Sequence, residues 1–195
     1  MTTVEDGVSS SGELDAGTLE RARQQQPAAC KAFIRHHQRA VGALLRRMLG
    51  PAGLDALTED LAQETFIRAL RALPRFDSQG PAKLSTWLLR IASRLAINEL
   101  RRRRPETQTI GEEASLAAPG TADADHRRRA IGAAIEAAVG ALAPEFRAAF
   151  VLREYHGLDY TEIAASLELD LGTVKSRLHR ARAKLRDALA EVRDV

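Results

Sequence analysis

The chain has 195 residues, a length that accommodates one large domain or two small ones and excludes a large barrel enzyme. Hydrophobic residues make up 45% and charged residues 28%, and the aromatic residues are only 5 Phe, 2 Tyr and 1 Trp, so the composition favours an all-α protein. The net charge of +3 is only a weak indication of a polyanionic partner, and a single cysteine, Cys30, excludes an internal disulfide.

The N-terminal segment has the composition of a disordered tail rather than of a signal peptide. It is rich in Ser, Gly and acidic residues, and no basic start is followed by an apolar run. The most apolar stretch, Ala130 to Ala143, contains Glu136 and is shorter than the roughly 20 residues that cross a bilayer. We expect a cytoplasmic protein with no membrane insertion, no metal site and no cofactor.

Charge is distributed unevenly along the chain. The net charge is −3 over 1–30, +9 over 31–104, −2 over 105–130 and −1 over 131–195. Because the acidic segment also contains Pro105, Pro119 and Gly120, we expect a flexible linker between two independently folding helical units. The predicted organisation is a tail (1–14), a first domain (15–104), a linker (105–130) and a second domain (131–195).

The first domain is predicted to begin with a short helix from Leu14 to Gln24, followed by a long helix from Pro27 to the stop signal Gly50-Pro51. The apolar positions of the long helix are Phe33, Val41, Leu44, Leu45 and Met48.

The next helix is predicted from Thr58, whose hydroxyl would cap the first amides, to Leu73. Its inward positions would be Leu61, Ala62, Thr65, Phe66, Ala69 and Leu73. Its outward positions are Asp60, Gln63, Glu64, Ile67 and Arg71. An acidic outward patch is unexpected on a domain of charge +9, although spacing alone favours an ordinary solvated helix start.

A further helix is predicted from about Ser85 to Arg103. Its core stripe would consist of Trp87 or Leu88, Ile91, Leu95 and Leu100. Its other side and its end carry Arg90, Arg94, Asn98 and the run Arg101 to Arg104. Four consecutive arginines exceed what a helix C-terminus needs, so we expect contact with phosphates. The polar loop from Asp77 to Lys83 could receive an unstacked base.

The second domain is predicted to contain a helix-turn-helix. A helix ends near Tyr155, a two-turn helix covers Tyr160 to Leu167, and a longer helix runs from about Leu171 to Val192. The stripe of Val174, Leu178, Ala181 and Leu185 would pack against Ile163, Ala164 and Leu167. The opposite face would be able to contact base edges and phosphates and consists of Thr173, Lys175, Ser176, Arg177, His179, Arg180, Arg182 and Lys184.

Three stretches in this order resemble the bacterial RNA polymerase sigma factors of the extracytoplasmic-function (ECF) group, and the resemblance covers about 15–190. The stretches are Glu59-Asp-Leu-Ala-Gln-Glu-Thr-Phe-Ile-Arg-Ala-Leu70, Thr86-Trp-Leu-Leu-Arg-Ile-Ala92 with Asn98, and Tyr160-Thr-Glu-Ile-Ala together with Gly172-Thr-Val-Lys-Ser-Arg-Leu-His-Arg-Ala-Arg182.

The resemblance implies a role for each patch. Residues Asp60, Gln63, Glu64 and Ile67 would dock on core RNA polymerase. The minus-ten promoter element would be recognised and melted by Lys83, Ser85, Thr86, Trp87, Arg90, Arg94, Asn98 and Arg101. The basic face of the last helix would read the minus-thirty-five element. The chain would act without catalytic residues of its own, directing transcription of a stress or envelope-response regulon under an anti-sigma factor.

The chain departs from the family pattern at three places. Glu168 stands where the family usually has Gly, Leu89 replaces an aromatic residue, and the loop that carries Pro81 is about two residues longer. Two other functions compete with this one: an autonomous helix-turn-helix regulator that dimerises through its first domain, and a small metal-dependent enzyme using His36, His37 and nearby acidic residues. Adjacent histidines on a helix point about 100° apart, which disfavours a shared ion.

Overall fold

The computed structural model describes residues 14–78, 80, 82–103 and 124–193, and every regular element among them is helical. The first domain contains α1 (Ala16–Arg23), α2 (Pro27–Leu49), α3 (Thr58–Ala72) and α4 (Leu84–Arg103), with short 3-10 turns η1 (Gly50–Ala52), η2 (Asp55–Leu57) and η3 (Leu73–Arg75). The second contains α5 (Ala124–Gly140), α6 (Pro144–Glu154), α7 (Tyr160–Leu167) and α8 (Leu171–Arg193). The all-α fold class is confirmed. The predicted tail and most of the predicted linker lie outside the described residues.

Helix α2 is the central element of the first domain. Pro27 occupies its first turn, where a missing N–H costs nothing, and the chain turns at Gly50-Pro51 as predicted. All five of its predicted apolar positions are fully buried. The described part of the chain contains no helix that is both long and apolar enough to span a membrane.

Helix α3 buries the face that its sequence predicts, with one correction. Thr65, Phe66, Ala69 and Leu73 are buried. Thr58 does not cap the helix, because it is already the first helical residue and its hydroxyl is buried without a hydrogen-bond partner among the described residues. The 3-10 turn η2 leads directly into the helix and takes the place of a side-chain cap.

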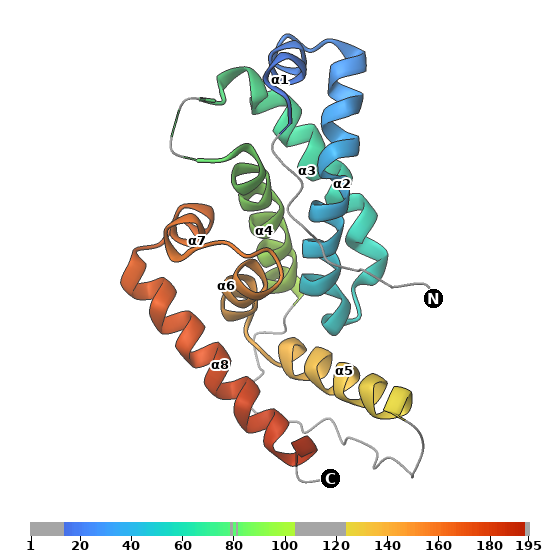
Figure 1. Ribbon diagram of the computed structural model, residues 1–195, viewed down its shortest axis with the longest axis vertical. Coiled ribbons are helices and arrows are strands. Elements are labelled where there is room, and N and C mark those ends of the chain that lie inside the picture. The colour runs from blue at the N-terminus through green and yellow to red at the C-terminus, as the bar shows by residue number, and fades with distance from the viewer. Residues whose placement is uncertain (1–13, 79, 81, 104–123, 194–195) are drawn as a thin grey trace.

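Helix α4 lies between the two domains (Figure 1), in contact with α2 and α3 on one side and with α6 and α7 on the other. Leu88, rather than Trp87, is its buried core residue. Leu89, Ser93 and Ala96 are buried as well, so burial extends beyond the single predicted stripe. A helix that is covered on two sides must bury small and polar residues along with leucines.

Helix α5 was not predicted, and it begins inside the segment that the sequence indicates as linker. Most apolar residues of α5 are alanines, so the contrast between its two faces, and hence its helical hydrophobic periodicity, is weak. Ala138 and Val139 are nevertheless buried. They form a separate hydrophobic cluster with Leu142 and with Ala181 and Leu185 of α8. The predicted stripe of α8 is therefore buried, but only its first half packs near α7, while its second half packs against α5.

The two domains are in direct contact, and one hydrophobic cluster continues from Phe33 and Leu88 to Leu152 and Ile163. The sequence indicates two independent units, but in the structure the apolar residues of α4 and α6 are buried in one shared cluster. Gly140 permits the close approach of α5 to η1, since a Cβ atom there would lie 2.5 Å from the Cβ of Pro51.

A buried arginine connects the domains at this contact. The guanidinium of Arg147 donates to the carbonyl of Met48 at 2.6 Å and to that of Leu142 at 3.2 Å, and it also donates to the carbonyl of Gly140. Burial lowers its pKa to about 10, so it remains charged at neutral pH. Nearby, the guanidinium of Arg47 lies 3.8 Å from the ring centroid of Tyr155.

His37 makes the stability of this fold pH-dependent. It is buried beside Phe33, and burial, together with the neighbouring His36, lowers its pKa to about 4. Its usual pKa is 6.5, so in acid the unfolded chain takes up a proton that the folded chain does not. Stability therefore falls as the pH drops from about 6.5 towards 4.

We expect His37→Leu to remove this contribution, about 2 kcal/mol between pH 7.5 and 5.0. Thermal melts at the two pH values should show that the parent loses about 6 °C more than the variant. Equal losses in the two proteins would contradict the assignment.

Candidate polymerase and nucleic-acid interfaces

The outward face of α3 combines acidic, amide and apolar groups. Asp60 and Gln63 are exposed, and Glu64 forms a 2.6 Å ion pair with Arg68 one turn later. Ile67 is 44% exposed, one of three large hydrophobic residues that are exposed in the described part of the chain. An exposed isoleucine next to carboxylates suits a protein partner better than DNA, because phosphates would be repelled.

The predicted minus-ten residues lie along one face of α4 and the loop before it. Thr86, Arg90, Arg94 and Arg101 recur at intervals of four, four and seven residues, which places them in a row along the helix. Asn98 is exposed, Ser85 is half-buried, and Thr86 is buried. The structure places the predicted arginines in one row, while Ser85 lies on another side of the helix and Trp87 is half-buried with its ring centroid 5.0 Å from that of Phe76.

Carboxylates of the second domain lie against this row. Glu168 pairs with both Arg90 and Arg94, and Glu145 pairs with Arg101 at 2.5 Å. The other described arginines of the terminal run pair with Glu99 of the same helix, at 2.8 Å for Arg102 and 2.5 Å for Arg103. Phosphates that contact these arginines would compete with the carboxylates already paired to them.

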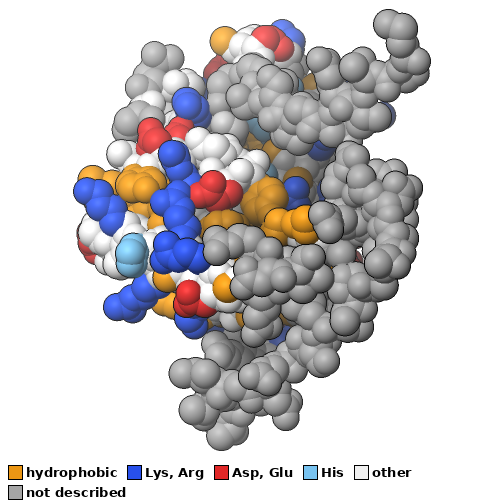
Figure 2. Space-filling model, turned by 60° about the horizontal axis from the view of Figure 1, so that its bottom comes forward, with side chains coloured by type: hydrophobic (Ala, Val, Ile, Leu, Met, Phe, Trp, Pro, Cys, Tyr) orange, Lys and Arg blue, Asp and Glu red, His pale blue; other side chains and the backbone are white. Residues whose placement is uncertain are grey.

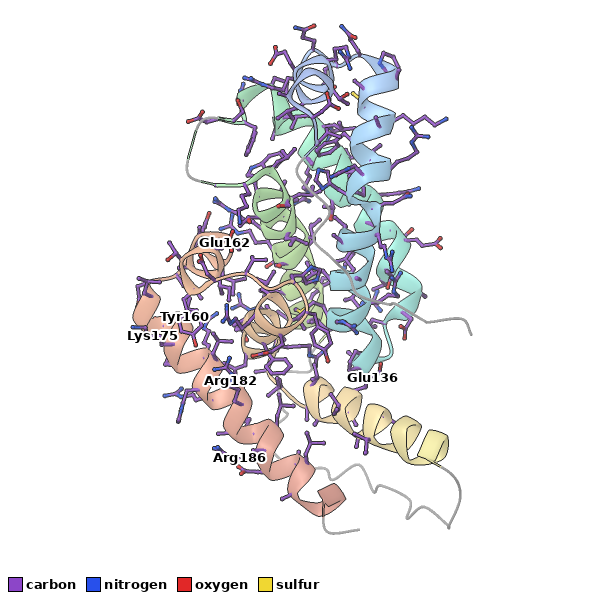
Figure 3. All side chains as sticks on the ribbon, viewed as in Figure 1. Glu136, Tyr160, Glu162, Lys175, Arg182 and Arg186 are labelled. Atoms are coloured by element: carbon purple, nitrogen blue, oxygen red, sulfur yellow. The ribbon has the colours of Figure 1, made fainter. Side chains whose placement is uncertain are left out.

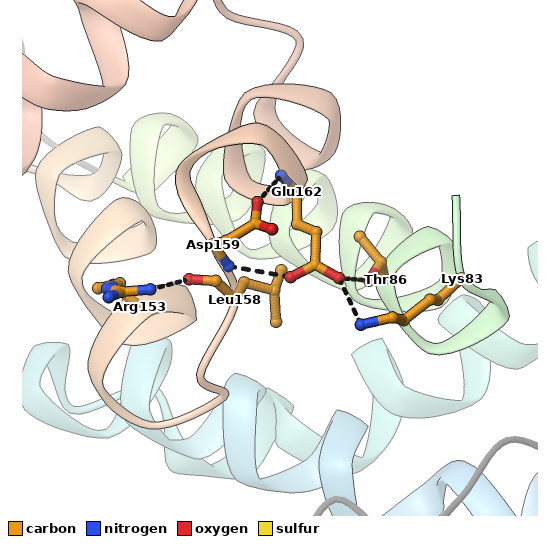
Figure 4. A network of polar contacts seen from close by, with 6 residues as sticks. All are labelled: Lys83, Thr86, Arg153, Leu158, Asp159 and Glu162. Atoms are coloured by element: carbon orange, nitrogen blue, oxygen red, sulfur yellow. Dashed lines mark hydrogen bonds and ion pairs between the residues drawn. The ribbon is translucent and has the colours of Figure 1, made fainter. Parts of the chain in front are cut away.

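Glu162 of α7 connects the loop before α4 with the helix-turn-helix (Figure 4). Its carboxylate pairs with Lys83 at 3.0 Å and lies 3.5 Å from the hydroxyl of Thr86. The same carboxylate accepts the backbone N–H of Asp159 at 2.9 Å, and the Asp159 carboxylate accepts the N–H of Glu162 at 2.7 Å. This reciprocal capping box fixes the start of α7 and, with it, the position of the Glu162 carboxylate.

The exposed face of α8 is the second basic surface. Its helix begins after Asp170, whose carboxylate accepts the N–H and hydroxyl of Thr173 at 2.7 and 2.6 Å. These two hydrogen bonds, that of the hydroxyl first, lower the pKa of Asp170. The exposed residues of this face are Lys175, Ser176, His179, Arg180, Arg182 and Lys184, while Thr173 and Arg177 are half-buried.

Most cations of this surface are available to a ligand. Figure 2 shows Lys and Arg side chains gathered on the side of the molecule where α7 and α8 lie, and Figure 3 places Lys175, Arg182 and Arg186 along α8. Arg182 pairs with Glu154 at 2.8 Å, whereas Lys175 and Arg180 have no ion-pair partner among the described residues. An uncompensated basic helix face after a short, capped helix suits insertion into a major groove.

Sequence reasoning did not identify the three glutamates that cover α4, namely Glu145, Glu162 and Glu168. Two signals were present: the Asp159-x-x-Glu162 spacing of a capping box, and an acidic residue at the end of α7. Glu168 adopts the left-handed conformation, with φ 53° and ψ 54°. That conformation costs a non-glycine residue about 1 kcal/mol.

Comparison with known proteins identifies the family. The family model for sigma-70 region 2 matches residues 33–106, and that for sigma-70 region 4 matches 132–185. The RNA polymerase sigma-H factor of Pseudomonas aeruginosa is 33% identical over 187 residues, which cover 91% of this chain and 94% of that protein. The chain belongs to the ECF RNA polymerase sigma factors.

Two further relatives agree with this assignment. The ECF sigma factor SigE of Mycolicibacterium smegmatis is 41% identical over 163 residues, covering 82% of this chain and 61% of that longer protein. The structure of CnrH in complex with the cytosolic domain of CnrY superposes with a TM-score of 0.62 at 26% identity, covering 88% of this chain and 94% of that one. The resemblance read from the sequence is therefore confirmed.

The histidine pair considered for a metal site is part of α2. The rings of His36 and His37 lie 4.7 Å apart, and His37 is buried among aromatic residues. No group of three or more His, Cys, Asp or Glu side chains that could hold an ion occurs within the described residues. Cys30 is half-buried, with its thiol sulfur 3.8 Å from the carbonyl oxygen of Ala22.

Proposed function

We propose that this sigma factor divides promoter recognition between its two basic surfaces. The exposed face of α8 reads the minus-thirty-five element, and the row along α4, with Trp87 and the preceding loop, recognises and melts the minus-ten element. The patch of Asp60, Gln63, Glu64 and Ile67 on α3 docks on core RNA polymerase. The first domain of this proposal ends at 104, and the second domain, predicted from 131, is taken to include the whole of helix α5.

The observation that carries the proposal is the separation of two faces on α8. Val174 and Leu178 are buried at 0% and 1% exposure, which fixes the rotation of the helix against the domain. Lys175 and Arg180 consequently point to solvent, where base edges and phosphates can be contacted. Thr173 and Ser176 place short hydroxyl side chains at the end that enters the groove first, and in the free chain these hydroxyls donate to Asp170 and to the carbonyl of Thr173.

We infer that the chain has no catalytic residue and acts in the cytoplasm, where it would work as a specificity subunit of the polymerase. An anti-sigma factor would restrain it, and its promoters would serve a stress or envelope response. The solved complex of CnrH with the cytosolic domain of CnrY, in which a similar chain is bound by a second protein, supports this expectation.

The experiment that tests the proposed function is size-exclusion chromatography with purified core polymerase, followed by run-off transcription on genomic fragments. A sigma factor co-elutes and programmes transcription from a subset of fragments. An autonomous helix-turn-helix regulator would bind DNA without co-eluting, and that result would overturn the proposal.

Arg180→Glu should abolish promoter use and leave polymerase binding intact. Losing a cation and adding a carboxylate at the groove surface removes about 1–3 kcal/mol per contact, a reduction of roughly 10- to 100-fold in run-off product. Arg35→Glu, a matched reversal on the exposed side of α2, is the control and should transcribe normally. Co-elution lost together with transcription would indicate a misassigned surface.

The double substitution of Asp60 and Gln63 by Arg should have the opposite effect. Adding two cations to an acidic docking patch replaces attraction by repulsion, so co-elution with core polymerase should be lost. Binding of the free variant to duplex DNA should be retained, because α8 is unchanged. Normal affinity for core polymerase would refute the docking assignment.

A further inference from the structure

Every basic side chain of the proposed minus-ten face is paired with a carboxylate from the second domain. These carboxylates come from α6, from α7 and from the residue that follows α7. The pairs are Lys83 with Glu162, Arg90 and Arg94 with Glu168, and Arg101 with Glu145. A complete match between one row of cations and one set of anions indicates more than a chance surface contact.

The backbone at Glu168 supports a specific role for its side chain. The C-cap position of α7 is left-handed, the conformation for which glycine is the usual residue because it has no Cβ. Glu168 is strained there, yet its N–H still bonds to the carbonyl of Ala164, and its two carboxylate oxygens reach separate arginines. The side chain supplies a contact that glycine, the conformationally favoured residue, could not.

Glu162 shows the same coupling of local structure to the contact between domains. Its carboxylate completes the capping box of α7 and simultaneously pairs with Lys83 (Figure 4). One carboxylate near the start of α7 and one just after its end thus pair with basic residues on α4 and in the loop before it. These pairs hold the two-turn helix against the row of arginines along α4.

We propose that these carboxylates occupy the places of DNA phosphates on α4, so that the closed chain masks its own minus-ten face and Glu168 is the central contact of this mask. The proposal rests on the assignment of α4 to the minus-ten element. The side chains of Arg90 and Arg94 are 38% and 50% exposed, so each pair is weak and is screened by salt. The phosphates of a DNA strand can therefore compete with the carboxylates for these arginines, and separation of the domains would remove the carboxylates altogether.

The test compares the binding of the free, full-length chain to a fluorescent single-stranded oligonucleotide of mixed sequence, measured by anisotropy. Glu168→Gln removes the charge, and Glu168→Gly removes the side chain and relieves the left-handed strain. Glu59→Gln is the matched control, because Glu59 is an exposed carboxylate of α3 with no ion pair to α4 among the described residues. Thermal melts of each variant verify that the chain is folded.

Both Glu168 variants should bind the oligonucleotide about fivefold more tightly than the parent and the control, with the gain reduced at high salt. Adding Arg90→Ala and Arg94→Ala to Glu168→Gly should abolish the gain, because Glu168 pairs with both arginines. The mask is overturned if neither Glu168 variant binds more tightly than Glu59→Gln, or if the gain survives when both Arg90 and Arg94 are replaced by Ala.

The assignment of α4 is checked separately by permanganate footprinting of promoter melting with reconstituted holoenzyme. Arg94→Ala should impair melting. Normal melting by this variant would overturn the minus-ten assignment, and the mask with it, whereas impaired melting without any gain in the Glu168 variants overturns the mask alone.

Discussion

The contact between α4 and the second domain is the interaction on which the rest of the arrangement depends. It buries the apolar side of α4 that the first domain alone leaves exposed. Beside this contact, buried Arg147 of α6 donates a hydrogen bond to the carbonyl of Met48 on α2 and also joins the two domains. The same contact brings three glutamates onto a row of basic residues. Apolar burial supplies most of the free energy that holds the two domains together, and half-exposed ion pairs supply little. In the proposed mask, the main effect of the carboxylates is therefore on the binding of anions to α4.

The nearly neutral chain contains two strongly basic surfaces that differ in how far they are balanced by acidic residues of the same chain. The segment 31–104 carries a charge of +9, and part of that charge is balanced from within the chain while the domains are closed. The face of α8 has no such balance at Lys175 and Arg180. Under the proposed assignments, the free protein presents one DNA surface, and the second becomes available on opening. A specificity subunit benefits from this difference, since weak binding to bulk DNA favours prior assembly with the polymerase.

The sequence predicted the elements whose apolar positions are large and regularly spaced. The buried residues of α2, the two faces of α3 and the helix-turn-helix follow from periodicity, because leucine and phenylalanine at helical intervals have few alternatives to burial. Helix α5 escaped prediction because alanine gives little contrast between faces. The cap expected at Thr58 was wrong because a 3-10 turn, which has no strong signature, leads into α3. The cover on α4 depends on contacts between residues about 44 to 79 positions apart, which no local pattern encodes.

The separation of the two domains on assembly is the central claim, and a distance measurement tests it most directly. Spin labels at Gln38→Cys on α2 and Ala165→Cys on α7, both exposed positions, would report the gap across α4 after Cys30→Ser removes the native thiol. Pulsed dipolar spectroscopy should give one short distance for the free chain and a longer one for the holoenzyme with core polymerase. The same distance in both states would show that α4 stays covered, and would contradict the account.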